Sequence, residues 1–177
     1  MIRPCNQSDF DAICAIVNDA AMAYKGVIPA DRWREPYMPA EELQEAIGSG
    51  VAFWGFAMDG DLIGVMGSQP VQDVTLIRHA YVRTSHRRHG IGGQVLRFLL
   101  ARIGTPALVG TWAAAEWAIR FYEKHGFRLV TPAEKDRLLP QYWGVPPRQI
   151  ETSVVLGDAK WFASLAHVER CGDCGNA

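Results

Sequence analysis

The first part of the chain shows two helical patterns separated by a proline-rich stretch. Residues 1–5 are predicted to form a first edge strand. Apolar side chains then recur at helical spacing, which predicts a helix over residues 8–24, with Ser8 and Asp11 at the spacing of a capping box. A short helix is predicted over residues 40–47. Because prolines recur between the two helices, that connection should be irregular.

Three apolar runs follow and predict neighbouring strands. The runs 51–58 and 62–69 are joined by Asp59-Gly60-Asp61, and Asp-Gly between two such runs is a strong hairpin signal. The third run covers residues 74–82 and is predicted to form the next strand of the same sheet.

The remaining pattern alternates between helices and strands. The order predicts one α/β domain over residues 1–157 with a mixed sheet. Residues 158–177 should form a C-terminal extension that is partly helical and then frayed. The predicted elements are a helix at 91–103, a strand at 107–111, a helix at 114–125, and strands at 127–130 and 149–156, with a proline-rich loop before the last strand.

Composition indicates an ordinary globular domain. The chain has 177 residues, of which 49% are hydrophobic and 21% charged, enough to bury a core. Apolar runs stay well below the roughly 20 residues of a membrane span, and the N-terminus has no signal-peptide core. We therefore expect a cytoplasmic protein that does not bind membranes.

The four cysteines do not suggest a disulfide framework. Cys5 and Cys14 are interpreted as small buried residues. Cys171 and Cys174 supply half of a tetrahedral zinc site, and the sequence has no second pair. We therefore expect no bound metal.

Positive charge is concentrated in one part of the chain. Residues 74–115 contain no Asp or Glu, although the formal net charge of the whole chain is only -1. This local excess favours a site for a polyanion. Six arginines lie in that stretch, at positions 78, 83, 87, 88, 97 and 102.

A glycine-rich turn lies between a predicted strand and a predicted helix, over residues 87–93. Its glycines lack the Cβ atoms that would keep a ligand away from the backbone, and the helix start offers unpaired N–H groups to an anion. Neither the dinucleotide fingerprint, which needs glycine where Val95 stands, nor the Walker pattern fits. The pattern Arg-x-x-Gly-x-Gly does fit, at Arg87, Gly90 and Gly92.

With this motif the chain resembles the GCN5-related N-acetyltransferase (GNAT) family. The segment 118–127, Ala-Ile-Arg-Phe-Tyr-Glu-Lys-His-Gly-Phe, is similar to the helix and turn after the fifth strand of that family. The resemblance covers roughly residues 1–156. It implies a mixed, mostly antiparallel twisted sheet of about seven strands flanked by helices and splayed between the fourth and fifth strands. It also implies acetyl-CoA as co-substrate.

The resemblance also implies where acetyl-CoA would bind. The diphosphate would lie on the N–H groups of the glycine loop, and the pantetheine arm would pair with the backbone near Ala80 and Val82. The N–H of Val82 would polarise the thioester oxygen. The implied cofactor-binding residues are Ala80, Tyr81, Val82, Arg87, Arg88, His89, Gly90, Ile91, Gly92 and Gly93.

Tyr122 matches the tyrosine that protonates the departing thiolate in many members of the family. A phenol is a neutral donor at neutral pH and suits this role. The structural alternative is that Tyr122 packs under the next strand, as its neighbour Phe121 would.

No carboxylate carries over as the general base. The strand position at which some family members carry glutamate is Leu76 or Ile77 here. His79 on the same strand is a candidate because imidazole titrates in the right range. A purely structural His79 and a chain of water molecules remain open alternatives, and Asp73 and Glu116 are further candidates.

The acceptor site is predicted from aromatic and arginine side chains. Residues 24–29 look somewhat like the corresponding region of phosphinothricin-type acetyltransferases. Rings with interspersed arginine would suit a small amine that carries a carboxylate or phosphonate; alternatively, the rings form core or a homodimer contact. The candidate substrate-binding residues are Tyr24, Arg32, Trp33 and Trp54.

The favoured hypothesis is an N-acetyltransferase that moves acetyl to a primary amine of a small molecule by direct attack. One alternative is a GNAT domain that binds acetyl-CoA without catalysis, as a sensor or interaction module. The missing glutamate supports it, as does Ala115, which stands where many relatives have an asparagine that contacts the pantetheine. A nucleic-acid binder is disfavoured by the sequence pI of about 6.5.

Overall fold

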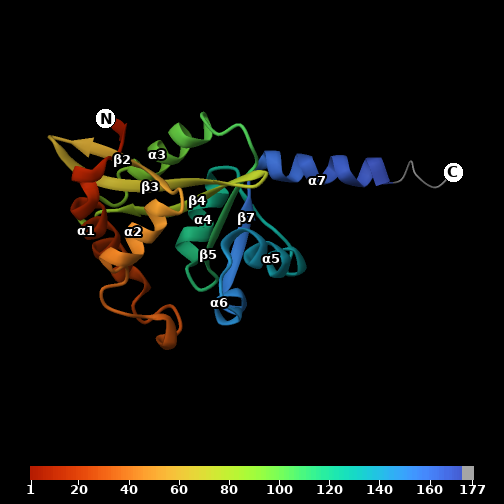
Figure 1. Ribbon diagram of the computed structural model, residues 1–177, viewed down its shortest axis with the longest axis horizontal. Coiled ribbons are helices and arrows are strands. Elements are labelled where there is room, and N and C mark those ends of the chain that lie inside the picture. Colours follow the sequence, from red (N-terminus) through yellow and green to blue (C-terminus); the bar gives the residue numbers. More distant parts are fainter. Residues whose placement is uncertain (173–177) are drawn as a thin grey trace. The chain divides into compact units, whose positions relative to one another are not determined.

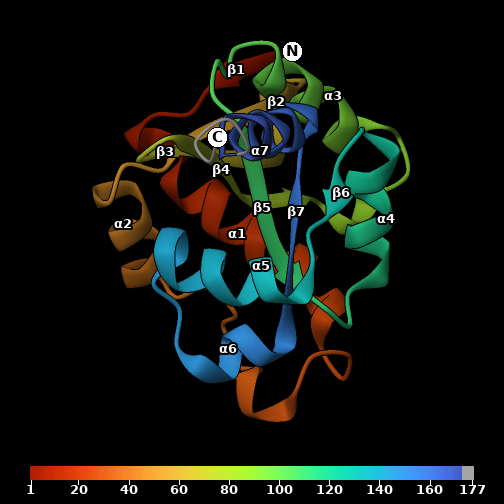
Figure 2. The ribbon, with the colours of Figure 1, turned by 90° about the vertical axis from the view of Figure 1, so that its right-hand side faces the viewer.

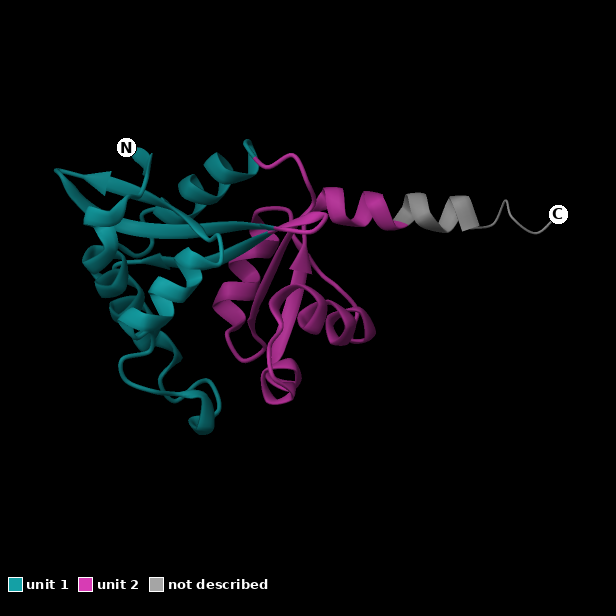
Figure 3. Ribbon diagram, in the orientation of Figure 1, with its two compact units in different colours: residues 1–70, 76–102 teal, residues 71–75, 103–177 magenta. Residues whose placement is uncertain are grey.

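The chain divides into two compact units. The computed structural model describes the backbone of residues 1–172 and the side chains of residues 1–165. Unit 1 comprises residues 1–70 and 76–102, and unit 2 comprises residues 71–75 and 103–177 (Figure 3).

Unit 1 contains an antiparallel sheet with helices on both faces. Figure 1 shows α1 and α2 on one side of the β2–β3 hairpin and α3 on the other. The predicted positions of these elements are confirmed, with ends that shift by a few residues. They are β1 (Ile2–Pro4), α1 (Phe10–Ala21), α2 (Ala40–Gly48), β2 (Ala52–Met58), β3 (Asp61–Val71), most of β4 (Val74–Val82) and α3 (Ile91–Leu100).

Neighbouring residues of β2 show how the sheet separates its two faces. Because side chains alternate along a strand, Phe53 and Trp54 point to opposite sides. Phe53 belongs to the core formed with α1 and α2. Trp54 packs on Phe98 of α3, with 5.1 Å between the ring centroids.

The hairpin between β2 and β3 forms as its turn sequence predicts. Asp59 and Gly60 both have positive φ, at 52° and 92°. Two consecutive residues in this conformation give a turn whose twist matches that of the paired strands. The register then places Trp54 opposite Met66.

The start of the first helical segment differs from the prediction. The capping residue is Asn6, whose side chain accepts a hydrogen bond from the N–H of Ser8 at 2.9 Å. The carboxylate of Asp9 accepts from the N–H of Asn6 and also pairs with Arg3 at 2.7 Å. The predicted capping box of Ser8 and Asp11 is therefore wrong. The capping residue is Asn6, two residues before Ser8, and it caps a short 3₁₀ turn (Gln7–Asp9).

Unit 2 contains β7 paired antiparallel with both β5 and β6. Figure 2 shows β7 beside β5, with α6 leading into β7. The predicted strands and helix up to residue 129 are confirmed. The elements are β5 (Ala107–Trp112), α4 (Glu116–Lys124), β6 (Arg128–Leu129), α5 (Pro132–Leu138), a π-helical turn (Leu139–Trp143), α6 (Pro147–Thr152), β7 (Ser153–Gly157) and α7 (Ala159–Gly172).

The segment before β7 departs most from the prediction. Residues 149–152 belong to α6 and not to the predicted strand, and the expected loop contains α5 and the π-helical turn. Pro132 and Pro147 lie in the first turns of their helices, where the missing N–H costs nothing. Thr131 and Glu134 form a capping box around Pro132.

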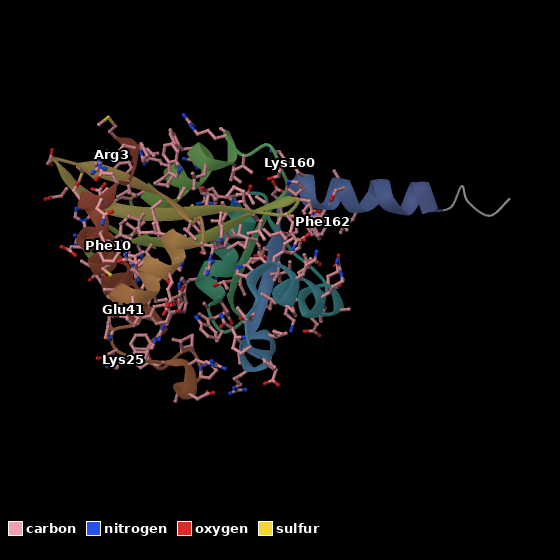
Figure 4. All side chains as sticks on the ribbon, in the orientation of Figure 1. Arg3, Phe10, Lys25, Glu41, Lys160 and Phe162 are labelled. Atoms are coloured by element: carbon pink, nitrogen blue, oxygen red, sulfur yellow. The ribbon has the colours of Figure 1, made fainter. Side chains whose placement is uncertain are left out.

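The start of α7 is fixed to unit 2. Lys160 donates a hydrogen bond to the carbonyl of Ile103. The guanidinium of Arg128 lies 4.0 Å from the ring centroid of Phe162, and Figure 4 labels Lys160 and Phe162 at this end of the helix. Trp161 is buried against Gly157, where a Cβ atom would lie 2.5 Å from the indole.

The strands follow the order β1-β2-β3-β4-β5-β7-β6 in one seven-stranded mixed sheet. The predicted α/β class and strand number are confirmed. The splay between the fourth and fifth strands, and the division at residue 157, stay predictions.

The cysteines form no described metal site. Cys5 and Cys14 are free and pack against the core, but they are half-buried and not buried as expected. The side chains of Cys171 and Cys174 lie outside the described residues. Within residues 1–165, no group of three or more His, Cys, Asp or Glu side chains is placed to hold a metal ion. Among the helices described, none is long and apolar enough to cross a membrane.

Candidate active site

The second half of β4 has an irregular backbone. His79 adopts a φ of 51°, in the left-handed region that side chains other than glycine rarely occupy. Residues 74–77 before it are buried, whereas residues 78–82 are only half-buried. Regular alternation of side chains therefore stops at His79, and the following backbone is turned relative to the first half.

Two glycines of β3 allow close approach to this part of β4. A Cβ atom on Gly67 would lie 3.1 Å from the carbonyl oxygen of Arg78 and 2.7 Å from Cγ1 of Val51. A Cβ atom on Gly64 would lie 3.3 Å from the carbonyl oxygen of Tyr81. The irregular half of β4 therefore depends on small residues in its neighbour.

His79 is poorly suited to hold a proton. Burial, and secondarily the charge of Arg78, lowers the pKa of His79 to about 3. Its ring stacks on Phe53 at a centroid distance of 5.6 Å, and Nε2 is buried without a hydrogen bond to the described residues. The imidazole is therefore neutral at pH 7, and its predicted role as general base stays untested.

The end of β4 leads into the glycine loop through a fixed corner. The N–H and Nε of Arg83 donate to the carbonyls of Ile63 and Leu62 at 2.8 and 3.0 Å. A short 3₁₀ turn (Thr84–His86) follows. These bonds attach the beginning of the loop to β3.

The loop then reaches α3 through two left-handed residues. Arg88 and Gly90 have φ values of 66° and 73°, and Gly90 is the residue that precedes the first turn of α3. No side chain caps this turn, and the first hydrogen bond of the helix runs from the N–H of Gln94 to Gly90 at 3.0 Å. The N–H groups of Ile91 and Gly92 therefore have no acceptor inside the helix and suit an anion.

The arginines near the loop have different uses. Arg87 donates through Nη2 to the carbonyl of Ala20 at 2.7 Å, and Arg78 donates to Gln69 at 2.8 Å. Arg102 lies over the ring of Phe98 at 3.4 Å. Arg88 and the neighbouring His89 are exposed. Counting arginines in the sequence could not show which of them bind a backbone carbonyl.

Four aromatic rings gather on the α1–α2 side of unit 1. Tyr24 lies 5.6 Å from Tyr37 and 6.4 Å from Tyr81, and Trp33 stacks on Tyr37 at 5.7 Å. Burial and the neighbouring hydroxyls raise the pKa of Tyr81 well above its usual value. We call these four residues the aromatic group; it joins β4 to the segment between the two helices.

The structure groups only some of the predicted acceptor residues. Tyr24 and Trp33 belong to the aromatic group, whereas Trp54 packs on the opposite sheet face. Nε of Arg32 is buried and makes no hydrogen bond within the described part of the chain. Lys25 pairs with Glu35 at 2.6 Å, and Glu35 also accepts from Trp33 at 3.2 Å (Figure 4 labels Lys25).

Tyr122 lies on α4 in unit 2. It is 5% exposed, and its ring lies 5.0 Å from Phe121 and 5.6 Å from Phe127. The packing expected for a structural tyrosine is therefore present, and the role of the hydroxyl as proton donor stays a prediction.

The other two candidate bases, Asp73 and Glu116, form polar contacts within unit 2. The hydroxyl of Tyr142 donates to the carboxylate of Asp73 at 2.7 Å, and burial together with this bond raises the pKa of Tyr142 to about 12. Glu116 is exposed and pairs with Arg120 at 3.1 Å. Asp73 thus has a structural use that the sequence did not reveal.

Comparisons with known proteins support the resemblance found in the sequence. Residues 49–129 match the family described as Acetyltransferase (GNAT) domain. This match contains β4, the glycine loop, α3 and Tyr122. No curated protein matches the sequence.

Solved structures of GNAT acetyltransferases share the fold. The PaiA N-acetyltransferase of Thermoplasma acidophilum, solved with coenzyme A, has a TM-score of 0.65 and 17% identity over 89% of this chain and 97% of its own. The ribosomal-protein-alanine N-acetyltransferase of Brucella melitensis has a TM-score of 0.62 and 19% identity over 89% and 98% of the two chains. The fold is therefore that of GNAT enzymes.

A third similar structure contains two ligands. The N-acetylglutamate synthase of Neisseria gonorrhoeae, complexed with coenzyme A and N-acetyl-glutamate, has a TM-score of 0.61 and 18% identity. The likeness covers 89% of this chain and 34% of the synthase. The Brucella protein is named for a ribosomal-protein alanine and the Neisseria protein for N-acetylglutamate, so the shared fold does not select one acceptor.

Proposed function

We propose that this chain is an acetyl-CoA-dependent N-acetyltransferase that acts on a primary amine of a small molecule by direct attack. The observation that carries the proposal is the glycine loop with Gly90 in the left-handed conformation at the start of α3. This loop lies inside the segment that matches the GNAT domain. Its orientation exposes helix N–H groups where a diphosphate would be held.

Several residues of the loop would bind acetyl-CoA. The N–H groups of Ile91, Gly92 and Gly93 would donate to the diphosphate, and the exposed side chains of Arg88 and His89 would add charge. Bound acetyl-CoA supplies a thioester, whose carbonyl carbon an amine can attack. The backbone of the half-buried residues Ala80, Tyr81 and Val82 would pair with the pantetheine arm, with the Val82 N–H polarising the thioester oxygen.

Two proton transfers accompany the reaction, one to the leaving sulfur and one from the attacking amine. As the amine nitrogen bonds to the carbonyl carbon, the carbon–sulfur bond breaks and sulfur carries away the electron pair. The Tyr122 hydroxyl would give its proton to that sulfur. The ammonium proton would leave through water, because a His79 with a pKa of about 3 is a weak base.

The acceptor would bind beside the aromatic group. Tyr24, Tyr37 and Trp33 connect β4 to the segment before α2, and Arg32 contributes a buried Nε that lacks a partner among the described residues. Rings and a guanidinium together suit an amine that also carries an anionic group. The proposed acceptor site leaves out Trp54, which packs on Phe98 of α3.

The proposal is tested by following free-thiol release from acetyl-CoA. The acceptor panel contains amino acids, phosphinothricin-like compounds, polyamines, aminoglycosides and peptides. We expect turnover with one class and a kcat lowered about 10²- to 10⁴-fold in Tyr122→Phe, because the phenol proton is lost. An unchanged melting temperature of the variant shows that packing is preserved. Unchanged kcat would contradict the assignment of Tyr122.

A non-catalytic acetyl-CoA-binding module is the second candidate. It is favoured by the depressed pKa of His79 and by the absence of a carboxylate on β4 within residues 74–82. Calorimetry with acetyl-CoA separates the two. Tight binding without thiol release on any amine supports the module, and turnover with one amine excludes it.

A further inference from the structure

The C-terminal end of α1 is bonded to the start of the glycine loop. The carboxylate oxygen Oδ2 of Asp19 accepts a hydrogen bond from the backbone N–H of Thr84 at 2.6 Å. The hydroxyl of Thr84 lies 3.4 Å from the carbonyl of Asp19. Arg87 donates through Nη2 to the carbonyl of Ala20 at 2.7 Å. Three contacts therefore join two segments that are far apart in sequence.

Asp19 occupies a position that is unfavourable for its own helix. It lies in the last turn of α1, where the helix dipole favours positive charge, and that turn contains no basic residue. An acid in this place is explained by a contact outside the helix. The Thr84 N–H is that contact.

Arg87 complements the same helix end. The last carbonyls of an α-helix have no partner inside the helix and carry partial negative charge. The guanidinium of Arg87 donates to the carbonyl of Ala20 in this last turn, which also accepts from the N–H of Met22. The side chain that the family motif would offer to a phosphate is thus directed to the protein backbone.

The loop is fixed from two directions. Arg83 binds the carbonyls of Leu62 and Ile63 on β3, and Asp19 with Arg87 fixes the turn against α1. Only after Arg87 does the chain enter its left-handed stretch, which leads to the free N–H groups of α3. The direction of those N–H groups therefore depends on where residues 84–87 are held.

We propose that Asp19 and Arg87 are positioning residues that hold the glycine loop in its ligand-binding conformation, with Arg87 acting on the loop and Arg88 on the ligand. This inference rests on the proposed function only in identifying the ligand as acetyl-CoA. A loop ordered in advance loses less conformational freedom when the ligand binds. Removing the Asp19 carboxylate should therefore raise Kd and KM for acetyl-CoA while leaving kcat unchanged.

The first test compares Asp19→Ala with Asp11→Ala. Both remove an exposed acid from α1, but Asp11 lies in the first turn of the helix, at the end opposite to Asp19. Hydrogen exchange of the backbone amides 84–93 is measured in the ligand-free protein, together with the Kd for coenzyme A. We expect Asp19→Ala to speed exchange of these amides and to weaken binding about 3- to 10-fold, as one lost hydrogen bond would. Asp11→Ala should change neither.

The second test compares the neighbours Arg87→Met and Arg88→Met. Loss of Arg87 should speed exchange of the loop amides and should leave the salt dependence of coenzyme A binding as in the unmodified protein. Loss of Arg88 should leave exchange unchanged and should reduce the salt dependence, because a charge that faces the ligand is removed. The reverse pattern would show that Arg87 binds the diphosphate directly and would overturn the proposal.

Failure of this inference is distinguishable from failure of the proposed function. Hydrogen exchange in the ligand-free protein does not require that coenzyme A binds. If exchange in Asp19→Ala matches that in Asp11→Ala, the contacts of Asp19 do not hold the loop, whatever the ligand is. If exchange rises but the Kd stays constant, the contacts stabilise the fold and do not position the loop. If the unmodified protein does not bind coenzyme A, the ligand assignment fails, and with it the positioning role.

Discussion

The two halves of β4 have the same secondary structure but different environments. Leu76 and Ile77 in the first half are 0% and 1% exposed, and the backbone is regular. From Arg78 to Val82 the side chains are half-buried, His79 is left-handed, and glycines of β3 lie opposite. The first half contributes hydrophobic stability, whereas the second half is partly exposed and contains a strained backbone at His79.

The contrast shows how one strand can serve two purposes. An apolar half holds the strand in the sheet, so the adjoining half can depart from regular geometry without the sheet dissociating. Substitutions in the two halves should consequently affect different properties.

The largest expected effect is on the buried half. Leu76→Ala removes a fully buried side chain and should lower the free energy of unfolding by about 2–5 kcal/mol. Val82→Ala in the half-buried part should cost clearly less. Chemical denaturation measures both. Equal losses would mean that the two halves do not differ in packing.

A smaller effect is expected from filling the space opposite the irregular half. Gly67→Ala would place a Cβ atom 2.7 Å from Val51 and 3.1 Å from the Arg78 carbonyl. Such overpacking should destabilise by about 1–3 kcal/mol. Gly48→Ala is the matched control, since a Cβ atom there meets nothing within 4 Å. A melting temperature of Gly67→Ala as high as that of the control would show that β4 does not require this glycine.

The smallest effect, over the range from pH 7 to pH 6, concerns the titration of His79. Its folded pKa of about 3 lies below the ordinary value of 6.5, so the unfolded chain binds a proton first. The neutral imidazole is compatible with the fold above pH 6.5, and stability is lost as pH falls from 6.5 towards 3, at up to about 1.4 kcal/mol per pH unit. Between pH 7 and pH 6 the loss should stay below about 1 kcal/mol.

His79→Asn separates this titration from the backbone geometry. Asparagine tolerates positive φ and does not titrate, so the variant should lose the additional pH dependence while retaining the turn. His89→Asn, which removes an exposed imidazole, should keep the additional pH dependence of stability. Urea unfolding at a series of pH values provides the measurement. Identical pH profiles for both variants would contradict the burial of His79.

Much of the fold could be predicted because local signals agreed with the tertiary structure. Asp59-Gly60 specified the hairpin, and the apolar pattern placed β4 at its observed residues. The segment before β7 was predicted poorly because its prolines were interpreted as loop signals. Pro132 instead starts a helix, and Thr131 with Glu134 form the capping box that would have indicated it.

The candidate site was only partly predictable. The spacing of Arg87, Gly90 and Gly92 located the loop, because the conformation depends on glycine itself. The partner of the Arg87 guanidinium depends on a helix far away in sequence, so no local pattern reveals it. The left-handed conformation of His79 likewise follows from packing between strands. No residue type in the sequence indicates it.

Arg88 has a consequence for any attempt to evolve this protein in the laboratory. Its left-handed backbone favours glycine or asparagine, whereas its proposed contact with the ligand requires a positive charge. Variants from a library at this position could be selected in two separate ways. Selection for expression alone would enrich glycine, whereas selection for acetyl transfer would restore arginine. Comparing the two sets of selected variants would distinguish the backbone preference at this position from the requirement for positive charge.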